Sequence, residues 1–484
     1  MSESVEGAKG TPTVAVVGCG LAGCMMAILL ARRGYRVEIF EKSEDWRKVK
    51  ENKGDDLHRN TIKRSINLAL SHRGRCALRK LGLEDQVLKR AIPMRCRAIH
   101  TQKTGSPDAD DFQPYDENDS KNCIYSVSRE LLNTLLLEKL EEHPRVKIFF
   151  GHHLMHIDRQ GVVHFENKGS GVSLNTYNDF QKGDYQLKPR LTIGADGAYS
   201  VVRESLLRLQ RTNFERNYIS HGYKELTIPP DANGSFALKD HNALHIWPRG
   251  SFMMIALPNP DKSFTCTIFA PLHSEGGLTG LMDVKTEGQI RDYMNTHFPD
   301  AVKVMPRYIQ DFKENPTSPL VQVKVSPWNF KDQILLVGDS AHAMVPFYGQ
   351  GMNAAFEDCL QFEETLEKFN DDISKAVLEF AKEREPAGRS IAQLSMGNYL
   401  EMRHHTGSKL FLLRKKLEGM LNYAFPNHWI PLYKMVTFTR IPYDKVIELE
   451  EKQADILEKS SYAAALCFSA GLLWAAKTVI KSSL

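Results

Sequence analysis

The feature that most constrains the fold lies near the N-terminus, in the stretch "TVAVVGCGLAGCMMAILLARRGYRVEIFEKS". Residues 14–17 form an apolar run that predicts a buried strand, and a glycine-rich turn follows it directly. The pattern then becomes helical over 21–33, with Gly34 placed to end the helix, and a second apolar run covers 36–40. This order of strand, glycine turn, helix and strand predicts a Rossmann-like βαβ unit.

The glycines and the acid after the second strand predict what this unit binds. Gly18 permits the tight turn, Gly20 lets backbone approach a pyrophosphate, and Gly23 lets the helix pack on the strand. The helix N-terminus attracts phosphate groups, and Glu41 can accept hydrogen bonds from ribose hydroxyls. A free 2′-hydroxyl is therefore favoured, as in FAD or NAD. The alternative is a tight structural βα turn.

Two later stretches favour FAD over NAD. In "LTIGADGAYSVVRESL" an apolar run ends at Asp196, which can hold a ribose or ribityl hydroxyl. In "LLVGDSAHAMVPFYGQGMNAAFEDC" a predicted strand over 334–337 ends beside Asp339, and Gly351 opens a helix near Met352. Ligands of doubly wound sheets lie at the carboxyl ends of the strands, and a helix N-terminus would stabilise the anionic reduced flavin. NAD sites need no such third segment.

The order of these three stretches resembles that of the single-component FAD monooxygenases of the aromatic-hydroxylase class. No second strand–GxGxxG–helix unit follows in the sequence, since the glycines at 169 and 171 lack a third glycine and a helical pattern. The class also has no separate domain for the pyridine nucleotide. The resemblance implies that NADPH binds transiently and leaves after it has reduced the flavin.

The middle of the chain predicts a sheet that covers the flavin. The stretch "NALHIWPRGSFMMIALPNPDKSFTCTIFAP" is rich in β-branched and aromatic residues, and residues 258–260 should turn one strand into the next. We expect a mostly antiparallel sheet that excludes water from the flavin. His245, Trp247 and Met253 are candidates to line the cavity, and each is also a candidate for the core of the sheet.

The expected fold is α/β: a Rossmann-like FAD-binding domain interleaved with a mixed or antiparallel β-sheet substrate domain, followed by a C-terminal helical region. The expected boundaries are 1–85, 120–205 and 326–388 for the FAD-binding domain, 86–119 and 206–325 for the substrate domain, and 389–455 for a helical lid.

Composition excludes several other functions. The net charge of +4 and the lack of a dense Lys/Arg block argue against nucleic-acid binding. The eight cysteines form no CxxC and no Cys/His cluster, so we expect neither a metal site nor a disulfide framework. The polar N-terminus is not typical of a secretory signal peptide. Residues 460–476 carry no charge and lie between Lys459 and Lys477, which predicts a membrane anchor over 459–480; an Ala-rich helix packed on the globular part is the alternative.

More specific blocks identify the chain as similar to the kynurenine 3-monooxygenases, a family of flavoprotein hydroxylases. They include "RSINLALSHRGR", "IPMRCRAIH", "HGYKELTIPP", "FMMIALPNPDKSFTCTIF", "NYLEMR" and "IPLYKMVTFTRI". The resemblance implies that Arg97 binds the substrate carboxylate and that Tyr115 donates a hydrogen bond to the same group. Asn398 and Tyr433 match the remaining substrate-site residues. A planar guanidinium suits a carboxylate because it can bind both oxygens.

The same resemblance extends the set of residues expected around FAD. Arg129 is a plausible partner of the pyrophosphate, and a surface arginine at a helix start is its alternative. The complete expected set is Gly18, Gly20, Ala22, Gly23, Phe40, Glu41, Lys42, Ser43, Ala69, Arg129, Leu154, Asp196, Asp339, Gly351, Met352 and Asn353.

The activity that the resemblance implies is hydroxylation of L-kynurenine to 3-hydroxykynurenine with NADPH and O2, through a flavin C4a-hydroperoxide. No catalytic side chain is expected, and a structural role is assigned to His342 in "DSAHA". The resemblance also implies attachment to the outer mitochondrial membrane, with the catalytic part facing the cytosol. The alternatives are a flavoprotein hydroxylase for another aromatic substrate and a membrane-tethered flavoprotein with a partner-binding role.

Overall fold

The computed structural model describes residues 13–49, 67–101, 105–116, 119, 121–167, 184–400 and 409–460. Its centre is a six-stranded sheet with the order β18-β19-β12-β1-β2-β8, in which every pairing is parallel except that of β18 with β19. The strands are β1 (Thr13–Val17), β2 (Arg36–Glu41), β8 (Val146–Phe150), β12 (Leu191–Gly194), β18 (Asn329–Phe330) and β19 (Ile334–Leu336).

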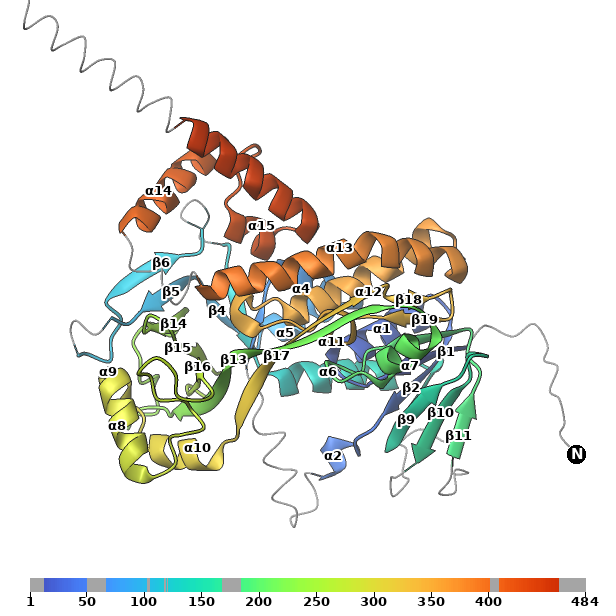
Figure 1. Cartoon of the computed structure of the whole chain (residues 1–484), viewed down its shortest axis with the longest axis horizontal. Helices are drawn as coiled ribbons and strands as arrows, with labels where there is room; N and C mark the ends of the chain where they lie inside the picture. Colours follow the sequence, from blue (N-terminus) through green and yellow to red (C-terminus); the bar gives the residue numbers. More distant parts are fainter. Residues whose placement is uncertain are drawn as a thin grey trace, which may run out of the picture.

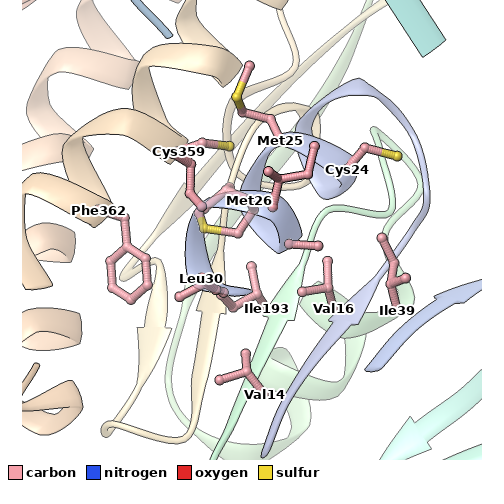
Figure 2. Packing of buried hydrophobic residues seen from close by; sticks show 14 of the residues in the cluster. Val14, Val16, Cys24, Met25, Met26, Leu30, Ile39, Ile193, Cys359 and Phe362 are labelled. Carbon is pink, nitrogen blue, oxygen red and sulfur yellow. The ribbon is translucent and has the colours of Figure 1, made fainter. Parts of the chain in front are cut away.

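The predicted βαβ unit is confirmed, with helix α1 (Leu21–Arg32) between β1 and β2. Residues Gly23–Ala31 of α1 are all buried, so this helix is apolar on every side. The reason is that α1 lies between the sheet and helix α12 (Gly351–Lys368). Figure 2 shows Val14 and Val16 of β1 beside Met26 and Leu30 of α1, with Phe362 of α12 on the far side.

Smaller elements complete this layer. Phe40 of β2 stacks on Phe165 at 4.0 Å between ring centroids, so a three-stranded antiparallel sheet, β11-β10-β9, packs against the central sheet. Its strands are β9 (His152–Ile157), β10 (Val163–Asn167) and β11 (Asp184–Leu187). Around them lie α2 (Trp46–Val49), α4 (His72–Leu81), α5 (Glu84–Leu88), α6 (Arg129–Glu141), α7 (Val201–Leu209) and a second small sheet, β3-β7-β4 (Leu68–Leu70, Ile124–Val127, Ile92–Met94).

The predicted cover is a seven-stranded sheet with the order β17-β13-β16-β15-β14-β5-β6 (Figure 1). It is antiparallel except where β5 runs parallel to β14, which confirms the expectation of a mostly antiparallel sheet. Its strands are β5 (Cys96–Ile99), β6 (Asp111–Pro114), β13 (Asn213–Ile228), β14 (Ala243–Pro248), β15 (Met253–Pro258), β16 (Phe264–Pro271) and β17 (Thr317–Ser326).

Both faces of this sheet are covered by other parts of the chain. One face packs on α8 (Glu287–His297), α9 (Pro299–Val302) and α10 (Tyr308–Glu314), and it carries the buried Trp247. Met253 lies on the opposite face with Val345 and Tyr399, toward the glycine-rich segment after β19. Because side chains alternate between the two faces along a strand, the positions on the Met253 face lie toward the glycine-rich segment and those on the Trp247 face lie toward α8–α10.

Helices form the rest of the chain. After β19 come α11 (Asp339–His342), the 3₁₀ turn η1 (Pro346–Tyr348), α12, α13 (Ile373–Leu400), α14 (Lys409–Ala424) and α15 (Leu432–Phe438). A further helix covers 443–460. Among the residues that the structure describes, no helix has both the length and the apolar character to cross a membrane. The predicted anchor, 459–480, lies outside the described residues from 461 onward.

Candidate functional site

Three chain segments meet at one edge of the central sheet. Strands β1, β12 and β19 are parallel neighbours, so their carboxyl ends lie side by side although they are far apart in sequence. A Cβ added to Gly18 would overlap the carbonyl oxygen of Ala195, and one added to Gly338 would lie 3.4 Å from the Cβ of Ala22. The three motifs that favoured FAD are thus in direct contact.

The first of these segments leaves room for a ligand at the start of α1. Gly18 has φ +100°, which explains why glycine is needed there, and a Cβ on Gly23 would overlap the Gly18 carbonyl. Gly20 differs, because it is exposed and a Cβ on it would meet no protein atom within 4 Å. The space beside Gly20 therefore lies next to the free N–H groups of a helix N-terminus, which is a site for an anion.

The acid at the end of β2 is held beside this helix start. Glu41 Oε2 accepts a hydrogen bond from the backbone N–H of Cys19 at 3.0 Å, and Oε1 accepts one from Ser43 N–H at 2.9 Å. Lys42 and Ser43 are exposed. The Phe40 side chain is part of the core, and its carbonyl oxygen accepts a hydrogen bond from Gly18 N–H at 2.7 Å.

Asp196 at the end of β12 has one oxygen in use and one without a partner. Its Oδ2 accepts hydrogen bonds from the N–H groups of Val201 and Val202, at 2.7 and 3.1 Å, at the start of α7. Its Oδ1 is buried and has no hydrogen-bond partner in the described part of the chain. Burial raises the pKa of this carboxyl above its usual range. A hydroxyl donor from a sugar chain would satisfy this oxygen.

The third segment supplies a second helix N-terminus. Asp339 is exposed at the start of α11, and α12 begins at Gly351 as predicted, with Met352 half-buried in its first turn. Asn353 is buried: its Oδ1 accepts a hydrogen bond from Ser71 N–H at 2.8 Å, and its Nδ2 donates to Ala69 O at 2.8 Å. Ala69 is thereby held against the glycine-rich segment.

The side chains of two residues in the expected FAD set, Arg129 and Leu154, have other surroundings. Arg129 is exposed at the first position of α6, where Ser128 caps the helix by accepting a hydrogen bond from Leu131 N–H. Leu154 lies in β9, and its side chain belongs to the hydrophobic core. Only its backbone remains available to a ligand.

Three of the four expected substrate residues lie together. The rings of Tyr115 and Tyr433 stack with centroids 5.2 Å apart and an interplanar angle of 9°. The guanidinium carbon of Arg97 lies 4.9 Å from the centroid of Tyr433 and 5.8 Å from that of Tyr115. Burial raises the pKa of the Tyr115 hydroxyl, and this oxygen has no hydrogen-bond partner among the described residues. A cation and a buried phenol therefore stand beside each other.

Sequence reasoning missed a third ring of this stack. Tyr348 of η1 lies 5.7 Å from Tyr433, with an interplanar angle of 12°. Asn398 of α13 donates a hydrogen bond to the carbonyl oxygen of Phe347, the residue before Tyr348, at 2.8 Å. It thus orients the segment that carries Tyr348. No sequence signal distinguished Tyr348, because an aromatic residue in "PFYGQ" fits an ordinary turn.

The other candidates have structural roles in this geometry. His342 of α11 is buried, and its Nε2 lies 2.6 Å from Asp358 Oδ2 of α12, so this contact joins the two helices. His245 bonds to His100 at 2.9 Å between ring nitrogens, and Trp247 Nε1 donates to Asp300 at 2.6 Å. The candidate role of these two in lining the cavity is wrong, because both point toward α8–α10.

These observations fit FAD. An adenosine diphosphate needs a glycine turn, a helix N-terminus and an acid for the ribose, which Gly20 and Glu41 provide at β1 and β2. An extended ribityl chain and flavin ring need further contacts, which Asp196 and the start of α12 provide. The described residues hold no cluster of side chains suited to a metal ion.

Comparisons with known proteins agree with this geometry. The profile of the FAD binding domain family matches residues 11–395, which include every strand of the central sheet. The fold is also that of 2-methyl-3-hydroxypyridine-5-carboxylic acid oxygenase, with a TM-score of 0.62 and 18% identity over 83% of this chain and 95% of that one. The chain therefore belongs to the FAD binding domain family, and its fold is that of the FAD-dependent hydroxylases.

Relatives of higher sequence identity show which family of this class the chain belongs to. Kynurenine 3-monooxygenase from Sus scrofa is 43% identical over 438 residues, which cover 90% of this chain and 86% of that protein. The enzyme of the same name from Anopheles gambiae is 40% identical, over 95% of this chain and 88% of its own length. The chain belongs to the kynurenine 3-monooxygenase family.

Proposed function

We propose that this protein hydroxylates L-kynurenine to 3-hydroxykynurenine, with FAD as the bound cofactor and NADPH and O2 as co-substrates. The observation that carries the proposal is the cluster of Arg97, Tyr115 and Tyr433, which lies between the cover sheet and the lid helix α15. The two kynurenine 3-monooxygenases named above align with 90% and 95% of this chain, at 43% and 40% identity.

The residues of this chain that would hold FAD are those at the strand ends. Gly20 and the start of α1 would receive the pyrophosphate, Glu41 the ribose, and Asp196 and Asp339 the sugar-chain hydroxyls. Ala69, Met352 and Asn353 would stand beside the ring, and Arg129 and the Leu154 backbone beside the adenosine half. When bound, FAD supplies a ring that NADPH can reduce and that then activates O2.

The protein's own contribution is to bind, orient and shield the substrate. In the proposed arrangement Arg97 pairs with the substrate carboxylate through two N–H donors, and Tyr115 donates its hydroxyl proton to the same group. The rings of Tyr433 and Tyr348 limit the directions in which an aromatic ring can lie. The amino group activates the ring toward an electrophilic oxygen, so no side-chain base is required.

In the proposed arrangement the lid would close this region against water. Lys434 of α15 forms an ion pair of 2.7 Å with Asp116, which follows Tyr115 in the chain and has an almost fully buried side chain. This pair stands beside the stack of Tyr115 on Tyr433, so the same two segments are held at two neighbouring points. We propose that this closure limits the loss of activated oxygen as peroxide.

We also propose the domain boundaries and the membrane anchor that the sequence suggests. Residues 1–85, 120–205 and 326–388 would form the FAD-binding domain, 86–119 and 206–325 the substrate domain, and 389–455 the lid.

Residues 459–480 would anchor the protein in the outer mitochondrial membrane, with the catalytic part facing the cytosol. Carbonate extraction of membranes from cells that express the full chain or residues 1–458 tests the anchor. Equal solubility of the two forms would contradict it.

The experiment that tests the function follows NADPH oxidation by purified protein with and without L-kynurenine, together with the mass of the product. We expect stimulated oxidation and a product one oxygen heavier than kynurenine, with FAD in the purified protein. A parallel assay with NADH tests the choice of nucleotide. A yellow protein whose NADPH oxidation ignores kynurenine would refute the substrate and leave the FAD fold in place, and other aromatic amino acids would be screened next.

A further inference from the structure

Arg73 is a fully buried arginine that the site described above does not include. It is the second residue of α4, and its Nη1 donates to both carboxylate oxygens of Glu357 in α12, at 2.8 and 2.7 Å. Its guanidinium carbon also lies 3.9 Å from the centroid of the Tyr443 ring. An isolated charge would be costly at such a place, so the contacts of this guanidinium indicate what it holds together.

The remaining donors of Arg73 reach the backbone of the lid. Nε donates to the carbonyl oxygen of Val436 at 3.0 Å, and Nη2 donates to that of Ile441 at 2.6 Å and, at 3.5 Å, to that of Met435. Met435 and Val436 lie in the last turn of α15, whose carbonyls have no partner within the helix. A cation is also favoured at a helix C-terminus. Arg73 therefore fixes the end of α15.

Glu357 connects this anchor to the cofactor side. It lies one helical turn after Asn353, which bonds to Ser71 and Ala69. The segment that runs from β3 into α4 is thus joined to α12 at two successive turns, through Asn353 and through the pair of Arg73 with Glu357. The start of α12 and the end of α15 are consequently held by one short stretch of chain.

α15 also carries Tyr433, which lies three residues before Val436. The Tyr433 ring contacts Tyr115, Tyr348 and Arg97. We propose that Arg73 is a positioning residue for the substrate: by binding the last carbonyls of α15 against α12, it sets where Tyr433 lies relative to Arg97. This inference rests on the proposed function, because the substrate pocket it describes is the one proposed there.

Arginine is the residue type that this role requires. Its planar group donates in several fixed directions at once, whereas the compact ammonium of lysine cannot reach one carboxylate and three carbonyl oxygens together. Arg73→Lys keeps the charge beside Glu357 and loses most of the bonds to the lid. The variant therefore separates the anchoring of α15 from the neutralisation of a buried carboxylate.

The test compares the wild type, Arg73→Lys and Arg440→Lys, with substrate binding, steady-state rates and FAD affinity measured for each. Arg440 is a matched control because it also joins the lid to α12, through Glu364 at 2.8 and 2.9 Å and through a longer ion pair of 3.5 Å with Glu357, while its side chain is one-third exposed. Among the described residues it bonds to no carbonyl of α15.

We expect Arg73→Lys to raise the Kd and KM for L-kynurenine about tenfold and to increase the share of NADPH oxidised without product, because Tyr433 is displaced. FAD affinity and kcat should change by less than about threefold. Arg440→Lys should leave the Kd near that of the wild type. A role in folding alone would lower the yield of folded protein and leave the KM of that fraction unchanged.

Several outcomes would overturn the inference. Unchanged Kd in Arg73→Lys, or a loss of FAD as large as the loss of kynurenine, refutes the positioning role while the proposed function stands. Failure of the wild type to bind kynurenine refutes both. If Arg73→Lys does not fold, Thr439→Val replaces it, since the Thr439 hydroxyl donates to Met435 O at 2.5 Å and accepts from Ile441 N–H at 3.2 Å at the same anchor. Wild-type affinity in Thr439→Val also refutes the inference.

Discussion

Substitution of Gly20 by alanine tests whether the turn at α1 receives the cofactor. Gly20 is the N-cap of α1, with φ −81° and ψ −170°, an extended conformation that any L-residue adopts. A Cβ at this position meets no protein atom within 4 Å. The protein itself therefore tolerates the methyl group, whereas a pyrophosphate bound against the backbone does not.

The expected magnitude follows from these two facts. Alanine is a poorer N-cap than glycine, which lowers the free energy of unfolding by less than about 1 kcal/mol. A methyl group forced against a close-packed ligand costs about 1–3 kcal/mol, which weakens FAD binding by roughly 5-fold to 150-fold. The variant should thus lose cofactor affinity far more than it loses stability.

The assay titrates FAD into apoprotein and follows the quenching of flavin fluorescence, with urea unfolding of the apoprotein in parallel. Gly34→Ala is the matched control at the other end of the same helix, where φ is +96° and a Cβ again meets nothing within 4 Å. Its left-handed backbone should cost about 1–2 kcal/mol of stability and leave FAD affinity unchanged. Wild-type FAD affinity in Gly20→Ala would refute the placement of the pyrophosphate at this turn.

Three further outcomes are expected. Arg97→Met should raise the KM for kynurenine at least about tenfold with FAD affinity unchanged, as steady-state rates and fluorescence titration will show. Trp247→Phe should lower the free energy of unfolding by about 1–3 kcal/mol in urea titrations, because the buried Asp300 loses a hydrogen-bond donor. Burial lowers the pKa of His100 to about 3 and that of His245 to about 4. The unfolded chain therefore binds more protons below pH 6.5. Urea unfolding at a series of pH values should show the free energy of unfolding falling by about 5 kcal/mol between pH 6.5 and 4, with both histidines contributing; a constant midpoint would contradict this.

The cofactor half of the fold was predictable because its signals are local. The turn at Gly18, the helix that follows and the acid at Glu41 lie within one short stretch, and each has a single physical reason. The ends of β12 and β19 were recognisable because apolar runs stop at Asp196 and near Asp339. Their contact then follows from the parallel order of the strands.

The cover sheet and the lid were less predictable, because their decisive contacts join distant segments. Alternation along β14 shows that His245 and Trp247 share a face, and it does not show which face lies toward the flavin when both are covered. Arg73 reads as a surface residue at a helix start, since nothing local indicates that Glu357 and the carbonyls of α15 surround it.

The order of strands in the central sheet has a consequence for synthesis on the ribosome. β1 and β2 emerge early, yet β19 is made about 300 residues later, which at usual elongation rates is roughly 15–60 s. Until then β12 lacks its outer neighbour and the nascent chain has only part of the edge that meets the flavin. Complete enclosure of the cofactor therefore waits for the last third of translation, when β19 and the start of α12 are made.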